Sequence, residues 1–465
     1  MSAPFIWIFL PLVIGGLSLL ITQERLATIV GGVTAITLTI AALIVPIDEA
    51  LSFGSFSLKV ASSFQILGRN LTLDSSQAPL LAILFGVTAL WFFGAESVGV
   101  ARRLTPLGLI IISLLVASIA VQPFLYAALL IELSILVAVP LLSPLDQTPS
   151  RGVIRFLIYQ TLGMPFILIA GWLSAGVEAS PGDLALTIQS TTMLGLGFAF
   201  LLAVFPLYNW IPLLMEEGSP YIVGFLLWLL PTVTSILGMS FLDRYAWLRT
   251  SDQVISALRV SGLLMIVTGG VWMAFQRHLG RMMAFAAVAE TGFILLSLSL
   301  DPKLGLGIVF LLLIPRGLGL AVWALSLSVL NSNSESLRFS SVQGLARMYP
   351  LATTGLILSA LSTAGFPLLA GFPPLLALWN GLARQSLSDS FWLLIGIIGL
   401  AAGAIRMLAV MVMADEKTAW ASKESWAQRG MLGIGVIGLF ILGLFPQAAN
   451  PILDKLPLMF QQLGH

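Results

Sequence analysis

Four charged residues lie within long apolar runs: Glu132, Glu290, Arg316 and Arg406. An ionisable group at the depth of membrane hydrocarbon costs at least about 2.5 kcal/mol, so we expect each to face a partner or a water-filled path. A carboxyl group in such a place can bind and release a proton. Arginine is effectively always protonated, so it supplies a fixed positive charge instead.

The composition is that of a polytopic membrane protein. Of the 465 residues, 58% are hydrophobic and 9% are charged, whereas soluble domains are about 25% charged. The chain has no Cys, which excludes thiol chemistry, and its two His residues are too few for a His-rich metal or haem site. We therefore expect no cofactor and no metal in this chain, and the net charge of +1 favours no nucleic-acid partner.

The apolar runs predict an all-α protein with about fourteen transmembrane helices, because roughly 17–25 apolar residues span a bilayer. The expected spans are 5–21, 26–45, 78–93, 106–121, 124–142, 153–173, 191–209, 221–240, 257–275, 282–300, 304–330, 351–386, 391–413 and 430–447. The polar stretch 46–77 has alternating apolar residues, which predicts a short β-hairpin.

Basic residues indicate the orientation of these spans. Lys and Arg are more frequent in the loops after odd-numbered spans. Cytoplasmic loops carry the excess of positive charge, so these loops should be cytoplasmic. The hairpin and both termini should then lie on the other side of the membrane.

Two of the expected spans contain helix-breaking prolines. One break is expected at Pro206–Pro212 in the seventh span and the other at Pro367–Pro374 in the twelfth. If spans 4–8 and 9–13 are five-helix units, each break falls in the fourth helix of its unit, and Glu132 and Glu290 each fall in the second. An odd number of spans inverts the second copy, and inverted repeats with paired broken helices are typical of transporters.

This pattern divides the chain into four parts. They are 1–105 with three helices and the hairpin, 106–245 and 255–413 as the two repeats, and 414–465 with a cytoplasmic loop and a last helix.

Five motifs in order resemble the antiporter-like membrane subunits of respiratory complex I, multisubunit Na+/H+ antiporters and membrane-bound hydrogenases. The resemblance covers roughly residues 60 to 410. The motifs are Leu71-Thr-Leu-Asp74-Ser-Ser-Gln-Ala-Pro, Leu130-Ile-Glu132-Leu-Ser, Phe205-Pro206-Leu-Tyr208-Asn-Trp210-Ile-Pro212, Arg281-Met-Met-Ala-Phe-Ala-Ala-Val-Ala-Glu290-Thr-Gly-Phe, and Gly344-Leu-Ala-Arg347-Met-Tyr-Pro350 followed by Gly365-Phe-Pro367 and Gly371-Phe372.

The chain also departs from that family. The family's relay lysines should fall near Leu201, near Trp228 and after Phe372, and none is present there. Two histidines of the family pattern are replaced by Glu290 and Tyr208. The resemblance thus keeps the fifth-span glutamate, Glu132, but loses the lysines that would carry protons.

The resemblance implies a membrane subunit of a complex I-like (NADH:quinone oxidoreductase-type) assembly in an energy-transducing membrane, such as a bacterial inner membrane. It would take part in proton translocation while redox chemistry proceeds in partner membrane subunits, because no catalytic redox site is recognisable here. The candidate proton-path residues are Glu132, Glu290, Arg316, Arg155, Arg406 and Tyr208. Arg316 and Arg406 are better explained as fixed charges or structural contacts than as carriers.

Two alternatives stay open. The lost lysines favour a non-conducting scaffold subunit of the same kind of complex. A freestanding cation/proton antiporter, moving H+ or Na+, is the other. Either way the bilayer is the surrounding medium.

Overall fold

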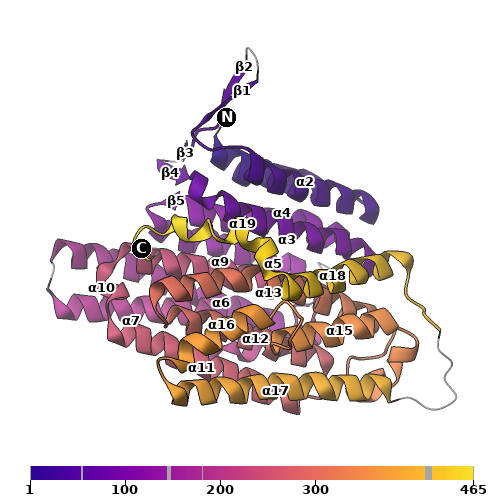
Figure 1. The fold of residues 1–465 in the computed structure, drawn as a ribbon. Coiled ribbons are helices and arrows are strands. Elements are labelled where there is room, and N and C mark those ends of the chain that lie inside the picture. The colour runs from indigo at the N-terminus through magenta and orange to yellow at the C-terminus, as the bar shows by residue number, and fades with distance from the viewer. Residues whose placement is uncertain are drawn as a thin grey trace.

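Long helices running side by side make up most of the molecule (Figure 1). The computed structural model describes residues 2–53, 56–66, 68–143, 148–180, 182–413 and 421–463. Within these residues, eleven helices are long and apolar enough to cross a membrane, and Phe5–Ser18, Ala127–Leu142 and Pro350–Thr363 are shorter apolar helices. The predicted class, an all-α polytopic membrane protein, is confirmed. The exact number of spans stays a prediction.

Most helices follow the predicted apolar runs within a few residues. The helix predicted at 153–173 extends to Ala179, the run 191–209 is replaced by Leu184–Leu201 and Trp210–Glu217, and the run 351–386 is divided into two helices. The helices are α1 (Leu10–Ser18, continuing a π-helical turn at Phe5–Phe9), α2 (Glu24–Ile44), α3 (Ala78–Ala95), α4 (Ala101–Ala120), α5 (Ala127–Leu142), α6 (Arg151–Ala179), α7 (Leu184–Leu201), α8 (Trp210–Glu217), α9 (Pro220–Arg244), α11 (Asp252–Phe275), α12 (Leu279–Leu298), α13 (Pro302–Asn331), α15 (Pro350–Thr363), α16 (Phe372–Ala383), α17 (Leu387–Val412) and α18 (Trp426–Leu444). Short helices α10 (Ala246–Arg249) and α14 (Phe339–Val342) lie in connections between long helices, and α19 (Asn450–Leu453) follows α18.

The polar stretch after α2 forms two small antiparallel sheets rather than one hairpin. The first pairs β1 (Ala50–Phe53) with β2 (Phe56–Lys59). The second joins β3 (Ser63–Ile66), β4 (Arg69–Thr72) and β5 (Val121–Gln122), which follows α4. Residues 54, 55 and 67 of the predicted hairpin, and residues 414–420 of the predicted cytoplasmic loop, lie outside the described residues.

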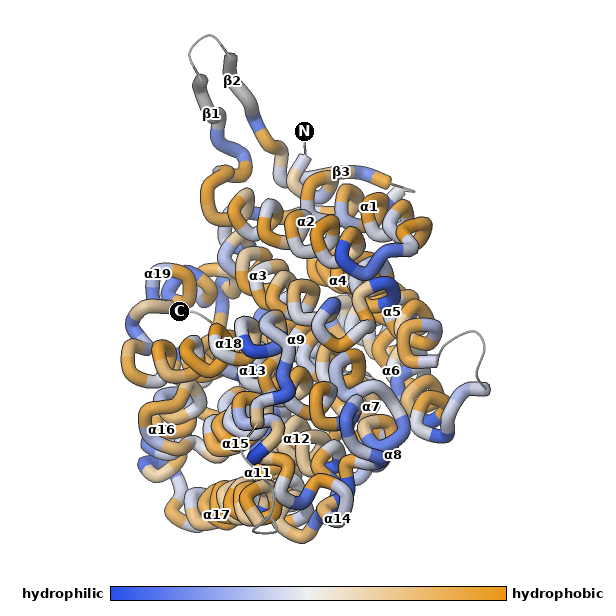
Figure 2. Tube along the Cα trace, turned by 90° about the vertical axis from the view of Figure 1, so that its right-hand side faces the viewer, coloured by the Kyte–Doolittle hydropathy of each residue, from blue (hydrophilic) through white to orange (hydrophobic). Residues whose placement is uncertain are grey.

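Burial separates central from peripheral helices. In the most apolar window of each helix, 94% of α12 and 89% of α9 is buried, against 22% of α7 and 17% of α18. The outward side chains are also apolar, as Trp172 and Leu387 illustrate. In Figure 2, hydrophobic colours cover outer helices such as α2 and α17 as well as the interior. This is expected where the surrounding medium is lipid.

Both predicted helix breaks are present. Between α7 and α8, Ala203 has φ +51° and residues Leu207–Asn209 form a 3-10 turn. Between α15 and α16, Gly365 has φ +71° and Leu368 has φ +75°. Each helix ends a few residues before Pro206 or Pro367, because Ala203 and Gly365, in the left-handed region, turn the chain first.

Candidate functional site

The most buried charged pair in the described part of the chain lies in the middle of two central helices. Glu290 is the twelfth of 20 residues in α12 and Arg316 the fifteenth of 30 in α13. Their exposed fractions are 7% and 3%, and Arg316 Nε lies 3.6 Å from Glu290 Oε2. An unpaired buried charge is strongly destabilising. Here the opposite charge of each group offsets part of the cost of burying the other.

Glu290 is tied to the second helix break. The hydroxyl of Thr363, the last residue of α15, donates a 2.9 Å hydrogen bond to Glu290 Oε1. The neighbouring Ser362 hydroxyl accepts from the backbone N–H of Gly371, at the other side of the break. A change in the geometry of this break would therefore reach the Glu290 carboxylate directly.

Arg316 is tied to the opposite side, by Nη2. This atom donates to the Thr291 hydroxyl at 3.0 Å and to the Leu227 carbonyl at 3.1 Å. In α9 the Leu227 carbonyl would normally accept from residue 231, but Pro231 has no N–H. Arg316 thus satisfies a backbone acceptor that the proline leaves free.

The ion pair keeps unused hydrogen-bonding capacity. Among the described residues, Glu290 Oε2 and Arg316 Nε and Nη1 have no hydrogen-bond partner. Glu290 and Arg316 both line a cavity of about 20 Å³, which we call the second-break cavity. A space of this size holds about one water molecule. Its lining residues are Glu290, Phe293, Leu312, Pro315, Arg316, Ser362, Thr363, Gly371 and Leu375.

Glu132 is associated with the first helix break. It is 9% exposed in α5, and Thr161 of α6 donates a 2.9 Å hydrogen bond to its Oε1. The preceding residue, Gln160, donates from Nε2 to the Leu201 carbonyl, where α7 ends. Within the described residues Glu132 forms no ion pair and its Oε2 has no partner.

A second cavity, also of about 20 Å³, lies at the first break; we call it the first-break cavity. Gln160 and Leu201 line one part of it, and Leu227 and Thr291 line another. Both of the latter residues accept hydrogen bonds from Arg316. Arg316 therefore bridges from the second-break cavity to the wall of the first-break cavity.

The other predicted site residues are not in this centre. Arg406 donates from Nη1 to the carbonyl of Ala274 in the last turn of α11, and its guanidinium stacks 5.5 Å from the Phe339 ring. Arg155 is exposed on α6. Tyr208 is buried in the first break, with its ring 6.2 Å from that of Phe285. Of the six predicted site residues, only Glu290 and Arg316 contact each other in the structure.

The hydroxyl and carbonyl partners of these charged groups were not predicted from the sequence. Thr161, Thr291 and Thr363 were missed because Thr is common in membrane helices. The position of Pro231 within an apolar run was the available signal for the Leu227 carbonyl. The positions that lack the expected lysines are filled by buried Leu201, Trp228 and Leu375.

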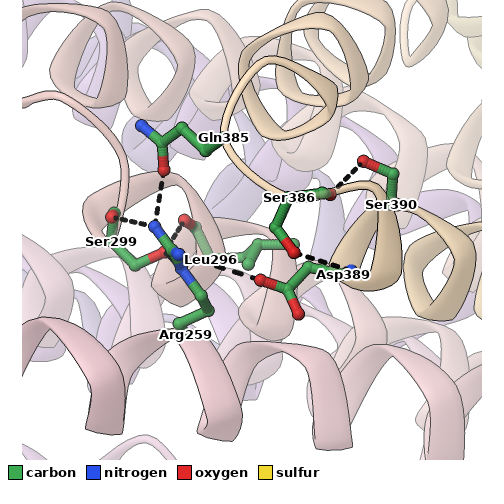
Figure 3. Close-up of polar contacts among 7 residues, drawn as sticks. All are labelled: Arg259, Leu296, Ser299, Gln385, Ser386, Asp389 and Ser390. Atoms are coloured by element: carbon green, nitrogen blue, oxygen red, sulfur yellow. Dashed lines mark hydrogen bonds and ion pairs between the residues drawn. The ribbon is translucent and has the colours of Figure 1, made fainter.

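Two further polar clusters lie at helix ends. Figure 3 shows Arg259 of α11 pointing at Ser299, Gln385 and Asp389; the Nη1–Oδ2 distance to Asp389 is 3.7 Å. Its side chain and that of Asp389 are about a quarter exposed, so the pair contributes little to stability.

The second cluster joins α8 to the start of α12. Arg281 pairs with Glu216, and Arg338 lies 3.9 Å from the same carboxylate. His278, which precedes α12, accepts from the Arg281 backbone N–H through Nδ1. Burial lowers the pKa of His278 from its ordinary value of 6.5, and nearby Glu216 opposes this shift. His278 is thus mainly a neutral cap of α12. No group of three or more His, Cys, Asp or Glu residues that could hold a metal occurs in the described ranges.

Comparisons with known proteins show which family the chain belongs to. Residues 153–405, more than half of the chain, match the family model described as "NADH:quinone oxidoreductase/Mrp antiporter, TM". NADH-quinone oxidoreductase subunit N of Rhodococcus opacus is 25% identical over 302 residues, 63% of this chain and 54% of that protein. The matched segment thus spans about half the length of that relative.

Solved structures agree in fold along the whole chain. A chain of respiratory complex I from Thermus thermophilus superimposes with a TM-score of 0.81 at 19% identity, covering 99% of both chains. A chain of the Mrp complex from Dietzia sp. DQ12-45-1b gives a TM-score of 0.80 at 15% identity, covering 100% of this chain and 99% of the other. At these identities the likeness is one of fold.

Proposed function

Because the chain belongs to the NADH:quinone oxidoreductase/Mrp antiporter family of membrane proteins, we propose that it takes part in proton translocation within a complex I-like assembly. Other membrane subunits would be its partners, and redox chemistry in partner subunits would supply the energy. The chain is an integral multi-pass protein of an energy-transducing membrane. The proposed orientation places the loops after the odd-numbered spans in the cytoplasm and both termini on the other side of the membrane.

One observation carries this proposal most directly. Glu290, a titratable carboxylate, is buried at mid-helix, paired with a fixed positive charge and hydrogen-bonded to the end of a broken helix. Its affinity for a proton depends on the distance to Arg316, because an opposite charge within about 4–6 Å favours the ionised form. Movement at the second break can therefore change whether Glu290 holds a proton.

Glu132 is proposed as the corresponding carboxylate beside the first break. The order of elements supports a repeat over 106–245 and 255–413: α4, α5, α6, the broken α7–α8 pair and α9 are matched by α11, α12, α13, the broken α15–α16 pair and α17. Glu132 and Glu290 lie in the second helix of each set. In this scheme Arg316 is a fixed charge, Arg406 caps α11, and Arg155 and Tyr208 are peripheral to the path.

A scaffold role is the alternative that a specific observation favours. Leu201, Trp228 and Leu375 are apolar and buried at the positions where relay lysines were expected. A subunit without those lysines could fill its place in a complex without moving protons.

The two functions are separated by proton uptake into membrane vesicles that hold the assembled complex. We expect Glu290→Gln, and separately Glu132→Gln, to lower the redox-driven rate of proton uptake. Asp389→Asn is the matched control, since it removes a carboxylate from the peripheral Arg259 cluster. Uptake equal to the control in both glutamate variants, with the complex intact, would favour the scaffold.

A further inference from the structure

Arg316 lies between the two small cavities and has contacts to both. It lines the second-break cavity together with Glu290 and Thr363. Its Nη2 donates hydrogen bonds to the Thr291 hydroxyl and the Leu227 carbonyl, and both residues line the first-break cavity. At 3% exposure the guanidinium fills this position without access to bulk water.

The chemistry of arginine makes this position unsuitable for proton relay. A relay group must accept a proton on one side and release one on the other, but a guanidinium has only donors and does not deprotonate in proteins. Its positive charge also repels an approaching excess proton, and in a low-dielectric interior this repulsion is weakly screened.

The neighbouring hydroxyl offers no bypass. Thr291 Oγ1 donates to the Ala287 carbonyl at 3.1 Å and accepts from Arg316 at 3.0 Å. Its proton is therefore directed back along α12 and not towards Glu290. The Leu227 carbonyl has no proton to pass on.

We propose that Arg316 is a proton barrier between the first-break and second-break cavities, so that Glu290 exchanges protons only from the side of the second break. This inference rests on the proposed function but adds a separate property. Glu290 lines the second-break cavity, whereas Glu132 lines neither cavity. Protons then do not cross directly between the two cavities. The barrier prevents a passive leak through the centre of the subunit.

The test measures passive proton leak, without any electron donor, as the decay of an imposed pH gradient across vesicles holding the complex. The double variant Glu290→Gln plus Arg316→Gln removes the cation while leaving no buried charge uncompensated. We expect its leak to be about tenfold faster than wild type, equivalent to a barrier lowered by roughly 1.4 kcal/mol. Glu290→Gln alone keeps the guanidinium and should not leak. Arg406→Gln, which removes a cation outside the two cavities, should not leak either.

A second variant keeps the proposal testable if the double variant fails to assemble. Arg316→Lys retains a cation that can release its proton, and Glu290 is the titratable group that faces it in the second-break cavity. We expect a leak that increases with pH in this variant and not in wild type. A wild-type leak in the assembled double variant, or no pH-dependent leak in Arg316→Lys, would overturn the barrier. Loss of pumping in Glu290→Gln tests the proposed function separately, since passive leak needs no redox turnover.

Discussion

At the scale of single residues, the Glu290–Arg316 ion pair is buried in the interior, and we propose that it has a functional role. Burying two charges is costly, and the pair is held by hydrogen bonds from Thr363 and to Leu227 and Thr291. An apolar pair of similar size would pack at least as well in such an interior. The pair is therefore not explained by stability alone, which agrees with the proposal that Glu290 binds and releases a proton.

A thermal-stability cycle on the purified protein in detergent tests how strongly this pair is coupled. Arg316→Met leaves a buried carboxylate without its partner. We expect the free energy of unfolding to fall by about 3–5 kcal/mol, and by less where Glu290 takes up a proton and loses its charge. Adding Glu290→Gln should recover most of that loss. Removing Arg259, which pairs with Asp389 at a partly exposed site, should lower the free energy of unfolding by about 1 kcal/mol or less. Equal losses for Arg259 and Arg316 would contradict a tightly coupled buried pair.

At the scale of elements, the second break is fixed by close packing across it. A Cβ on Gly371 would lie 1.9 Å from the Ser362 carbonyl oxygen, so only glycine permits this approach. The break in turn positions Thr363 against Glu290.

Gly371→Ala should therefore destabilise the protein by about 1–3 kcal/mol, the usual range for overpacking, and also reduce proton uptake. Gly307→Ala is the matched control, because nothing lies within 4 Å of a Cβ on Gly307 in α13. Thermal unfolding and vesicle uptake assays would report both effects. Identical behaviour of the two alanine variants would show that the break tolerates displacement.

The sequence predicted the elements far better than their contacts. Apolar runs and prolines are local signals, so the spans and the breaks near Pro206 and Pro367 could be predicted. The pairing of Glu290 with Arg316, from different helices, depends on how α12 and α13 pack, which no local pattern specifies. Thr363 acquires its role only because α15 ends beside Glu290, and that contact spans 73 residues.

At the scale of the whole molecule, orientation in the membrane is directly testable because the chain has no cysteine. A single Ser332→Cys, in the exposed segment after α13, should react with a membrane-impermeant thiol reagent only from the cytoplasmic side. Thr250→Cys, exposed after α10, should react only from the other side. Labelling of right-side-out and inverted vesicles would decide this, and the reversed pattern would invert the proposed topology.

We propose that this subunit moves protons through its buried carboxylates, Glu132 and Glu290. The most direct measurement is the number of protons translocated per electron by the assembled complex, with wild-type protein and with Glu132→Gln plus Glu290→Gln. We expect a clearly lower ratio in the double variant, while the complex still assembles and still transfers electrons. An unchanged ratio would contradict it and leave the chain as a scaffold.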